Sequence, residues 1–598
     1  MAEKTPRIQP DLKEKDFPIM FGWTGRILIL DLTDRKYDAA CPAPEIYRDF
    51  IGGRGLGGNY LKNDITRRWD DPAMPLIFMT GPLVGTLSPT SGRMAVMSRS
   101  PLTGTTGDAS VGGRFGTELK KAGWDGIIFK GRADGLTGIE IVDQDVVFTD
   151  AARFQGLSVS KIQDQLGKQG AFAAVGPAAE NGVCFANIMF DGHYAAGRNG
   201  LGLVFASKNL KYVSVSGTRR IRVFDRLSLK KAREDILRLG AASPVLMGEL
   251  GITRFGTAAL FDLTHSRRMM PTDNFRRTFF EPAGKINAHA YHQKFGYRKT
   301  GCKGCHILCK KKGASGEILP EFEAMNHFSA LLNNTDMNVV VNANRICNDM
   351  GMDAISAAGT LACCMEIQNR PLAANDIIRL LQDIAMGRGE GKALGRGAFE
   401  YAKAHGNPEA AMTVKKQELP AYDPRGACGM ALGYATSTRG GCHLRSYTIG
   451  NEVLRKPVPT DRFSFAGKAR IVKIAEDANA IIDSLTACKF MFFAASLEEY
   501  AKALTAVTGF PSSGQELLKT GERICYRERM MNHQNGFTDA DDDLPQRFFQ
   551  SPGSGTAWMG IPALSREDFM MARHAYYRIR GLDEKGRPQA WKIRELGL

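Results

Sequence analysis

Three cysteines stand close together in the segment RKTGCKGCHILCKKKG, which covers residues 298–313. Cys302, Cys305 and Cys309 follow a C-x2-C-x3-C spacing, with basic residues on both sides of the row. Thiolates bind soft metal ions, so this spacing indicates a metal centre, either a zinc site or an iron–sulfur cluster. The lysines among the cysteines argue against three ordinary buried thiols, because lysine is rarely buried without a partner.

A centre of either kind requires a fourth ligand. The nearby candidates for a zinc site are His306, inside the row, and His327. An iron–sulfur cluster takes four thiolates, and the fourth often comes from far along the chain. Cys488 in DSLTACKF is the best candidate, because it follows an aspartate and ends an apolar helical segment. On these residues alone, both kinds of centre stay open.

The composition is that of an ordinary globular chain with a basic balance. The 598 residues are 43% hydrophobic and 24% charged, and 79 Lys and Arg against 63 Asp and Glu leave a net charge of +16. The basic residues are spread along the chain, without a long basic block or a zinc-finger or RNP pattern, so no nucleic-acid partner is expected. An acidic protein partner or an anionic cofactor accounts equally well for the balance.

Cysteine usage and the N-terminal residues indicate the compartment. The 12 cysteines are too few for a disulfide scaffold, and the first 20 residues lack the apolar core of a secretory signal. No apolar run reaches the roughly 18 residues that a membrane span requires, so no span is expected. We therefore expect a cytoplasmic protein, in which metal or redox roles outrank disulfides.

Glycine-punctuated β-rich runs fill the chain from Trp23 to about residue 215, with GRILILDL, PLIFMTGP and GIIFKG as examples. Beyond about residue 219, apolar residues at three- and four-residue spacing predict helices, and the breaker-rich KKQELPAYDPRGACG marks a joint. The expected fold class is α+β, an N-terminal β-rich domain of two sheets followed by two mainly helical domains. The expected divisions are a polar arm over 1–20 and domains over 21–217, 218–424 and 425–598.

Many segments occur in an order that is itself informative. They are GWTGRILILDLT, FIGGRGLGGNYL, TGPLVGT, SGRMAVMSRSPLTG, GGRFGTELKKAGWDGIIFKG, VGPAAENGVCFANIM, AAGRNGLGLVFASKNLK, the cysteine row, NDMGMD, GYATSTRGGCHLR, DSLTAC and YYRIRGLDEKGRP. In this order they resemble the aldehyde:ferredoxin oxidoreductase family, tungsten enzymes that carry a bis-pterin and one 4Fe–4S cluster. The resemblance runs over nearly the whole chain. It implies a tungsten bis-molybdopterin, or tungstopterin, held by the β-rich domain and by two later motifs.

The resemblance implies that NDMGMD and DSLTAC each bind one pterin, because a carboxylate accepts a bidentate pair from pterin N–H groups. On its own residues NDMGMD is more typical of a helix that ends at a glycine. The second motif departs from the family, with Thr486 and Ala487 in place of glycine and leucine. The pterin-contacting residues implied are Asn348, Gly351, Asp353, Arg445, Asp483, Leu485 and Lys489. Cys488 closes the second motif and so ties the cluster to one pterin.

The phosphates of the pterins and a bridging Mg²⁺ imply a further set of residues. Phosphates bind cations and backbone N–H groups, and Mg²⁺ binds carbonyl oxygens, phosphate and water. The two arginines implied are Arg93 and Arg198, and the two carbonyls belong to Ser110 and Asn199. The glycines that would admit the phosphates are Gly112, Gly113, Gly197 and Gly200.

Oxidation of an aldehyde requires a group that polarises the carbonyl and a base for water. The resemblance implies His443 of GCHLR for the first role and a glutamate after the cysteine row for the second. Glu321 is the preferred base and Glu323 the alternate. The implied substrate is a small aldehyde, and the implied partner is ferredoxin or a ferredoxin-like electron-transfer subunit.

The lysines near the cysteine row have two interpretations. Lys299, Lys303 and Lys310–Lys312 form either a docking patch for an acidic ferredoxin or an ordinary solvated loop. Two other functions stay open: a tungsten subunit of a benzoyl-CoA-type reductase on the same scaffold, and a basic zinc-bearing nucleic-acid-binding protein. The assembly is expected to be a homodimer or a hetero-oligomer.

Overall fold

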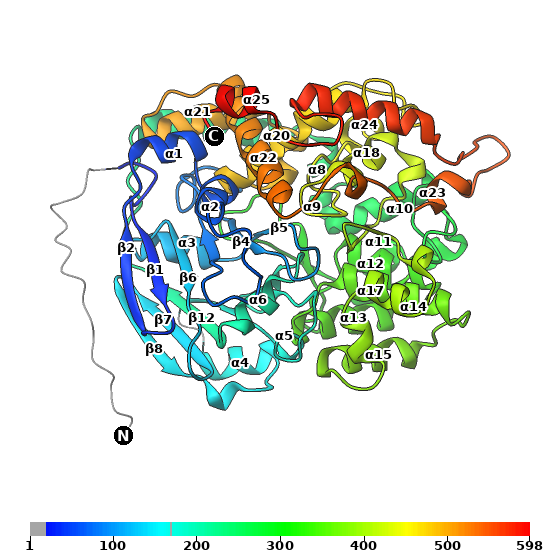
Figure 1. Ribbon diagram of the computed structural model, residues 1–598, viewed down its shortest axis with the longest axis horizontal. Coiled ribbons are helices and arrows are strands. Elements are labelled where there is room, and N and C mark those ends of the chain that lie inside the picture. The colour runs from blue at the N-terminus through cyan, green and yellow to red at the C-terminus, as the bar shows by residue number, and fades with distance from the viewer. Residues whose placement is uncertain (1–19, 168–169) are drawn as a thin grey trace.

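The computed structural model describes residues 20–167 and 170–598, and divides them into a β-rich half and a helical half (Figure 1). The strands between Ile27 and Ser216 form two six-stranded sheets, and mainly helices follow. The predicted α+β class, with two sheets before a mainly helical part, is confirmed. All but the last residue of the arm expected over 1–20 lies outside the described residues.

The first sheet has the strand order β2-β1-β6-β3-β4-β5 and is mainly buried except at its edge strand β2. Its strands are β1 (Ile27–Asp31), β2 (Lys36–Ala40), β3 (Leu76–Met79), β4 (Met94–Arg99), β5 (Thr106–Val111) and β6 (Gly126–Lys130). β1 runs parallel to β6, with Ile27 opposite Gly126, and the other pairings are antiparallel. The continuous apolar runs LIFM and GIIF follow from burial on both faces of this sheet.

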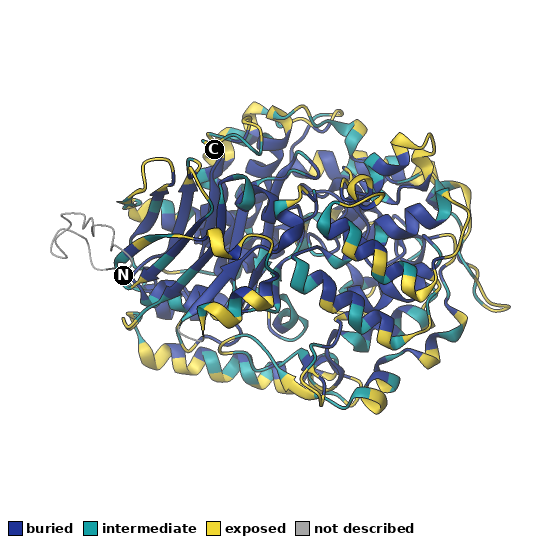
Figure 2. Cartoon of the chain, turned by 90° about the horizontal axis from the view of Figure 1, so that it is seen from below, coloured by how far each residue is buried: buried dark blue, intermediate teal, exposed yellow. Residues whose placement is uncertain are grey.

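The second sheet has the order β11-β10-β9-β12-β7-β8. Its strands are β7 (Thr137–Val142), β8 (Asp145–Asp150), β9 (Ala171–Ala174), β10 (Ile188–Phe190), β11 (Tyr194–Ala196) and β12 (Leu210–Ser216). The two sheets share a core: the Phe78 ring of β3 lies 5.5 Å from the Phe190 ring of β10. Figure 2 shows these strands mainly in the buried class, with exposed residues on the peripheral helices.

Helices of the β-rich half are α1 (Pro44–Phe50), α2 (Gly53–Leu61), α3 (Phe115–Lys121), α4 (Val159–Leu166), α5 (Pro177–Glu180) and α6 (Leu201–Ser207). The later helices are α7 (Arg226–Ala241), α8 (Pro244–Met247), α9 (Ile252–Phe255), α10 (Ala259–Ser266), α11 (Ala288–Phe295), α12 (Phe322–Phe328), α13 (Met337–Met350), α14 (Ala354–Ile367), α15 (Ala374–Met386), α16 (Gly391–Leu394), α17 (Ala398–Ala404), α18 (Cys428–Thr436), α19 (Ile449–Glu452), α20 (Lys468–Leu485), α21 (Leu497–Thr508), α22 (Gly514–Gln534), α23 (Arg547–Gln550), α24 (Arg566–Arg580) and α25 (Ala590–Leu596). Two short antiparallel ribbons are also present. β13 (Arg298–Thr300) pairs with β14 (Lys310–Lys312), and β15 (Thr413–Val414) pairs with β16 (Gln417–Glu418).

The C-terminal helices α20, α21 and α22 return to the β-rich half and lie beside α1 and α2 (Figure 1). Leu56 of α2, Ile482 of α20 and Ile524 of α22 share one apolar core with the first sheet. At Gly53 (φ +40°), the first residue of α2, a Cβ would overlap the carbonyl oxygen of Asp483. The glycines of FIGGRGLGG therefore permit a backbone approach that joins the two ends of the chain.

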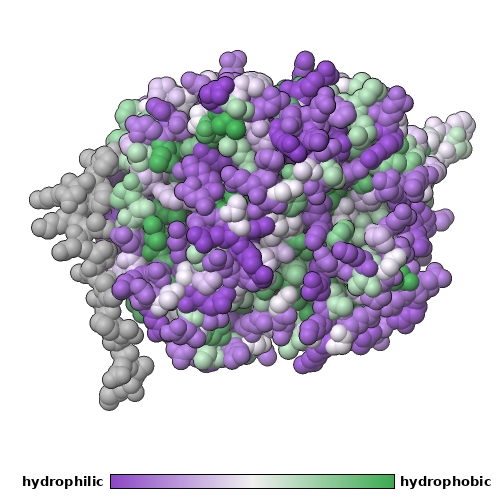
Figure 3. All heavy atoms as spheres, viewed as in Figure 1, coloured by the Kyte–Doolittle hydropathy of each residue, from purple (hydrophilic) through white to green (hydrophobic). Residues whose placement is uncertain are grey.

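The surface is hydrophilic over most of the face in Figure 3, with scattered apolar residues. Across residues 20–167 and 170–598, no single helix is long and apolar enough to cross a membrane. One bent pair of segments, Arg226–Ala241 with Pro244–Ser266, meets that requirement by length and composition only.

Candidate active site

The three cysteines of the row lie in the loop between β13 and β14, whose register places Arg298 opposite Lys312. Cys488 follows α20 by three residues. All four cysteines are half-buried. The Leu308 N–H donates to Cys305 Sγ at 3.3 Å, which orients one thiol of the loop.

Backbone contacts bring the four cysteines together. The Lys303 N–H donates to the Gly113 carbonyl at 3.2 Å, and the Arg93 N–H donates to the Thr486 carbonyl at 3.3 Å. A Cβ on Gly112 would overlap Cys302 Sγ, so only glycine admits the loop here. Burial raises the pKa of Cys488 to about 11, and Cys305 and Cys302 also raise it, whereas Arg93 lowers it. The predicted fourth cysteine thus lies among the other three.

The zinc alternative with His327 receives no support from this arrangement. His327 is fully buried and its Nε2 lies 3.1 Å from the Leu419 carbonyl oxygen. In the described part of the chain, no group of three or more His, Cys, Asp and Glu is arranged to hold a single metal ion. A four-iron cluster binds each thiolate through a different iron, so its ligands stand farther apart than those of one ion.

Arg93, which directly precedes β4, contacts Ser110 of β5 beside the cysteines. Its Nε donates to Ser110 Oγ at 2.9 Å and its Nη2 to the Ser110 carbonyl at 2.7 Å. Burial lowers the pKa of Arg93, but the neighbouring Cys488 and Cys302 thiols raise it overall. Two residues predicted for the phosphate and Mg²⁺ region, Arg93 and Ser110, are therefore in direct contact beside the cysteines.

Arg198 contacts the first predicted pterin motif. Its Nε donates to Asp353 Oδ2 at 3.1 Å, and its Nη2 donates to the Glu418 carbonyl at 2.6 Å. Asp353 also caps α14, since its Oδ1 accepts from the Ile355 N–H. Gly351 (φ +78°) ends α13 in the left-handed conformation. NDMGMD is thus a glycine-closed helix end that also presents a carboxylate to a buried arginine.

Asn199, the next residue after Arg198, contacts Gln417 and Arg439. The Asn199 side chain donates to Gln417 Oε1 and to the Arg439 carbonyl, both at 2.9 Å, and its own carbonyl accepts from Ser100 Oγ. Gly200 (φ +69°) lies where a Cβ would overlap the Cys184 carbonyl oxygen. Asn348 lies within α13. Asp349 caps α4 through the Ser160 N–H, so its carboxylate lies on the outer side of this motif.

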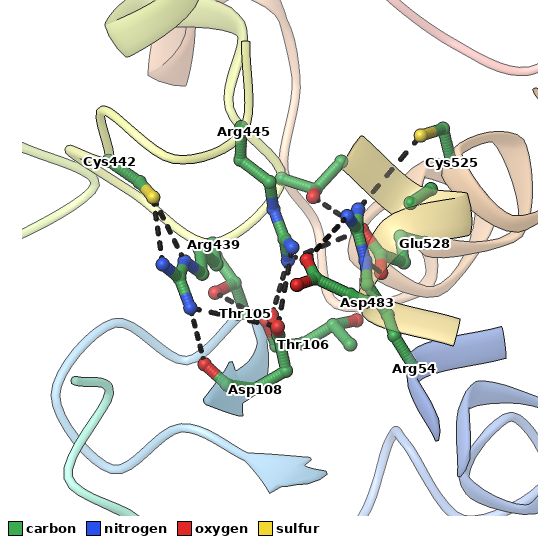
Figure 4. A network of polar contacts seen from close by, with 12 residues as sticks. Arg54, Thr105, Thr106, Asp108, Arg439, Cys442, Arg445, Asp483, Cys525 and Glu528 are labelled. Carbon is green, nitrogen blue, oxygen red and sulfur yellow. Dashed lines mark hydrogen bonds and ion pairs between the residues drawn. The ribbon is translucent and has the colours of Figure 1, made fainter. Parts of the chain in front are cut away.

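A buried ionic network surrounds the second predicted pterin motif (Figure 4). Arg54 donates to Glu528 through two nitrogens at 2.6 and 2.7 Å and lies 3.7 Å from Asp483. Arg445 pairs with Asp108 and lies 3.5 Å from Glu528. These side chains come from α2, β5, α20, α22 and the loop before α19. The network therefore joins both ends of the chain around Asp483.

Other members extend this network towards the segment that contains Cys442 and His443. Arg439 donates to the Asp108 carbonyl at 2.6 Å and to Cys442 Sγ at 3.1 and 2.9 Å. Burial raises the pKa of the Cys442 thiol, but Arg439 and Arg445 lower it overall. Lys489 pairs with Asp483. Leu485, in contrast, is an apolar core residue of α20.

His443 and Glu323 face one another, with Nε2 and Oε1 3.4 Å apart. The other oxygen of Glu323 accepts from the Ala421 N–H at 2.7 Å. Burial raises the pKa of Glu323 to about 8, and burial together with Arg198 lowers the pKa of His443 well below its usual range. The Tyr422 ring lies 5.5 Å from the imidazole. The pair is therefore a neutral acid–base couple at neutral pH.

Glu321, the preferred base in the sequence analysis, lies elsewhere. Its side chain is 45% exposed and pairs with Lys310 at 3.0 Å. Lys310 lowers the pKa of this carboxyl. Of the two glutamates, Glu323 is the one that the structure places against His443.

Two family models match the chain. The description of the first is "Aldehyde ferredoxin oxidoreductase, N-terminal domain", over residues 27–217, and that of the second is "Aldehyde ferredoxin oxidoreductase, domains 2 & 3", over residues 231–598. The chain belongs to the aldehyde ferredoxin oxidoreductase family.

Curated relatives match this chain over nearly their whole length. The chain is 37% identical to the tungsten-containing aldehyde ferredoxin oxidoreductase of Pyrococcus abyssi, over 97% of this chain and 99% of the relative. It is 25% identical to the WOR-like subunit of an aliphatic sulfonate oxidoreductase of Pyrococcus furiosus, over 97% of each. Among solved structures, the active-site complex BamBC of benzoyl coenzyme A reductase shares the fold, with a TM-score of 0.82, 22% identity and coverage of 97% and 98%.

This aldehyde ferredoxin oxidoreductase family member leaves many buried polar atoms without a hydrogen bond around the site. They are Arg54 Nη1, Thr106 Oγ1, Asn199 Oδ1, Glu323 Oε1, Ser437 Oγ, His443 Nδ1 and Arg445 Nε. Each such group costs about 1–3 kcal/mol of folding free energy unless a partner satisfies it. Their concentration around Asp108, Asp483 and His443 indicates the place of a large polar ligand.

Arg54, Asp108, Arg439 and Glu528 were missed by the sequence analysis. Arg54 stands in FIGGRGLGG and Arg439 in TRGGCHLR, so glycine-flanked arginines in the family segments were the available signal. Asp108 and Glu528 lie in an ordinary strand and an ordinary helix, and no local pattern marks them.

Two surface hollows lie away from this network. One, of about 480 Å³, is lined by α13 and α15 residues such as Asn342 and Arg379. The other, of about 310 Å³, is lined by residues that include Lys161, Arg345 and Asp349. Neither contains a residue of the buried ionic network or of the His443–Glu323 pair.

Proposed function

We propose that this protein oxidises aldehydes to carboxylic acids and delivers the electrons to ferredoxin. The observation that carries the proposal is the pairing of His443 with Glu323 beside the buried ionic network. That network includes Asp483, which lies five residues before Cys488 (Figure 4). The relatives at 35–37% identity, which are named tungsten-containing aldehyde ferredoxin oxidoreductases, support the same activity. They also support the assignment of the chain as an oxidoreductase.

The cofactors proposed are a tungsten bis-molybdopterin, one 4Fe–4S cluster and Mg²⁺. The buried unpaired atoms listed above fit a polar cofactor with many hydrogen-bonding groups, and the four neighbouring cysteines fit a cluster. When bound, the tungsten centre would act as a Lewis acid and two-electron acceptor, and the cluster would carry single electrons.

Residues of this chain have distinct proposed roles towards these groups. Asp353 and Asp483 would each accept hydrogen bonds from one pterin, and Arg93 and Arg198 would neutralise phosphate. The carbonyl oxygens of Ser110 and Asn199, which accept hydrogen bonds from Arg93 and Ser100 in this structure, would bind Mg²⁺. The cluster ligands proposed are Cys302, Cys305, Cys309 and Cys488.

The acid–base pair would act on the substrate itself. The His443 imidazole would donate a hydrogen bond to the carbonyl oxygen of the aldehyde and so make the carbon more electrophilic. Glu323 would accept a proton from the attacking water once its carboxyl is ionised, and its raised pKa makes that carboxylate a stronger base than an ordinary glutamate. The overall reaction consumes one aldehyde and one water, and releases one carboxylic acid, two protons and two electrons.

Anaerobic purification with metal analysis tests the proposal, followed by a panel of aldehydes with a viologen dye as acceptor. We expect tungsten, about four iron atoms per chain and viologen reduction that depends on an aldehyde. Protein that is fully loaded with tungsten and iron but reduces no viologen with any aldehyde would overturn the activity. The benzoyl-CoA-reductase alternative rests on the shared fold alone. A dienoyl-CoA added to the panel as electron donor tests it, because benzoyl-CoA is itself an electron acceptor and cannot reduce viologen.

A further inference from the structure

The hairpin that carries the cysteine row exposes several positive charges. Arg298, Lys299, Lys303 and Lys312 are all exposed. In the part of the chain that the structure describes, none of the four forms an ion pair with a carboxylate. These four residues are called the hairpin patch below.

The patch differs from the set of lysines expected from the sequence. Lys310 turns to Glu321, and Lys311 is only 5% exposed, with its Nζ 2.8 Å from the Leu308 carbonyl. Side chains alternate between the two faces of a strand, so three consecutive lysines cannot all point outward in the same way. Lys299, Lys303 and Lys312 stay at the surface, and Arg298 joins them.

The hairpin patch surrounds the part of the cysteine row nearest to solvent. Lys303 lies between Cys302 and Cys305, and the next residue, Gly304, is exposed. A Cβ added to Gly304 would meet no atom within 4 Å, so this turn opens directly to solvent. An electron held at the four cysteines would therefore have a short route to a protein that docks here.

The charges within the patch are arranged unfavourably for the isolated chain. Arg298 stands directly opposite Lys312 across the antiparallel ribbon. Like charges in that position destabilise a strand pair. The acidic groups close by do not relieve them: Glu321 pairs with Lys310, and Glu317 packs against Gly313. An anionic surface placed over the ribbon would relieve this repulsion.

We propose that the hairpin patch is the docking site for an acidic one-electron carrier protein of the ferredoxin class. The proposal rests on the proposed function, which requires such an acceptor. Each docked carrier would be reduced by one electron, so two docking events would follow the oxidation of one aldehyde. Charge complementarity of this kind raises the association rate and makes it depend strongly on ionic strength.

Charge reversal tests the site. The triple variant Arg298→Glu, Lys299→Glu and Lys312→Glu changes the patch without touching the turn between the cysteines. The matched control reverses two exposed lysines on α16 and α17, with Lys392→Glu and Lys403→Glu. Binding of an oxidised acidic ferredoxin, its KM as acceptor, viologen-linked turnover and iron content are measured for each protein.

We expect the triple variant to bind ferredoxin at least about tenfold more weakly, in line with the loss of electrostatic steering. Its iron content and viologen-linked turnover should equal those of the unmodified and control proteins. Equal ferredoxin affinity in all three proteins would overturn the docking site. Absence of aldehyde-dependent viologen reduction by the unmodified protein would instead count against the proposed function.

The unmodified protein provides a second test should the triple variant lose iron. Its ferredoxin affinity should fall steeply as salt concentration rises, whereas viologen-linked turnover should change little. An affinity that does not change with salt would overturn the proposal without any substitution.

Discussion

Glu323 Oε1 lies 3.4 Å from His443 Nε2, in an interior where neither of these side chains is more than a fifth exposed. The other glutamate of the same segment, Glu321, lies at the surface with Lys310. The two carboxyls therefore differ in environment although a single residue separates them. This difference allows the role of each to be tested by the same conservative change.

Glu323→Gln should lower aldehyde turnover by about 10²–10⁴-fold, because the substitution removes a positioned proton acceptor. Steady-state turnover with viologen is the measurement, with tungsten and iron content as controls. Glu321→Gln is the matched variant and should retain turnover within a few-fold. The opposite result, a large loss in Glu321→Gln with a normal Glu323→Gln enzyme, would return the base to Glu321.

The raised pKa of Glu323 predicts a pH dependence. Because burial raises this pKa to about 8, the carboxyl is mostly protonated at neutral pH and becomes a base as the pH rises through that value. Turnover should therefore increase from pH 6 to about pH 8 and then level off. Glu323→Asp should shift the pH at which turnover rises, and Glu323→Gln should remove the rise. An unchanged dependence of turnover on pH in Glu323→Gln would show that another group causes the rise.

Cys488→Ala should remove the cluster or convert it to a three-iron form. The structure places this thiol close enough to Cys305, Cys302 and Arg93 for their charges to shift its pKa. Iron analysis and the EPR signal of the reduced protein are the measurements. Cys525→Ala is the control, since Cys525 is buried against Arg54 and away from the row. An unaltered four-iron signal in Cys488→Ala would show that another residue supplies the fourth ligand.

Lys310 and Glu321 should shift the potential of the cluster in opposite directions. Burial lowers the pKa of Lys310, but Glu321 and Cys309 raise it overall, so this cation lies close to a proposed cluster ligand. Lys310→Gln removes a positive charge and should lower the potential, whereas Glu321→Gln should raise it. Shifts of tens of millivolts are expected, since about 59 mV corresponds to a tenfold change for one electron. An EPR-monitored titration that gives shifts of the same sign would contradict this account.

Arg54→Met should destabilise the protein by about 3–5 kcal/mol, because buried Glu528 would lose its two-nitrogen partner and keep only Arg445, 3.5 Å away, as a neighbouring cation. Chemical unfolding of the metal-free protein measures this loss. The double variant Arg54→Met, Glu528→Gln should recover part of the stability by removing the uncompensated charge. A double variant less stable than the single one would contradict the pairing.

The sequence predicted the features that depend on local pattern. The β-rich and helical halves follow from the residue types in each run. Cys488 was expected as the fourth ligand because it follows an aspartate and ends an apolar helical segment, and the family resemblance tied it to the same cluster. NDMGMD was interpreted both as a glycine-closed helix end and as a pterin motif. The structure has the helix end, and it also places Asp353 against Arg198.

Features that depend on side-chain direction were beyond the sequence. Glu321 is the residue directly before α12 and Glu323 lies in its first turn, so the two point to different sides of the helix axis. Only the packing of α12 decides which of them meets His443. The Arg54–Glu528 pair joins α2 to α22, near opposite ends of the chain, and no local pattern connects residues so far apart.

The close approach of Gly53 to Asp483 has a consequence for assembly of the enzyme. The N-terminal sheet and α2 are synthesised long before α20 and α22, yet the ionic network requires all of them. A nascent chain that has released only its β-rich half offers Arg54 and Arg93 without Asp483, Glu528 or Cys488. The cofactor proposed for this site would therefore be inserted only after translation of almost the whole chain, into a nearly finished fold rather than an emerging domain.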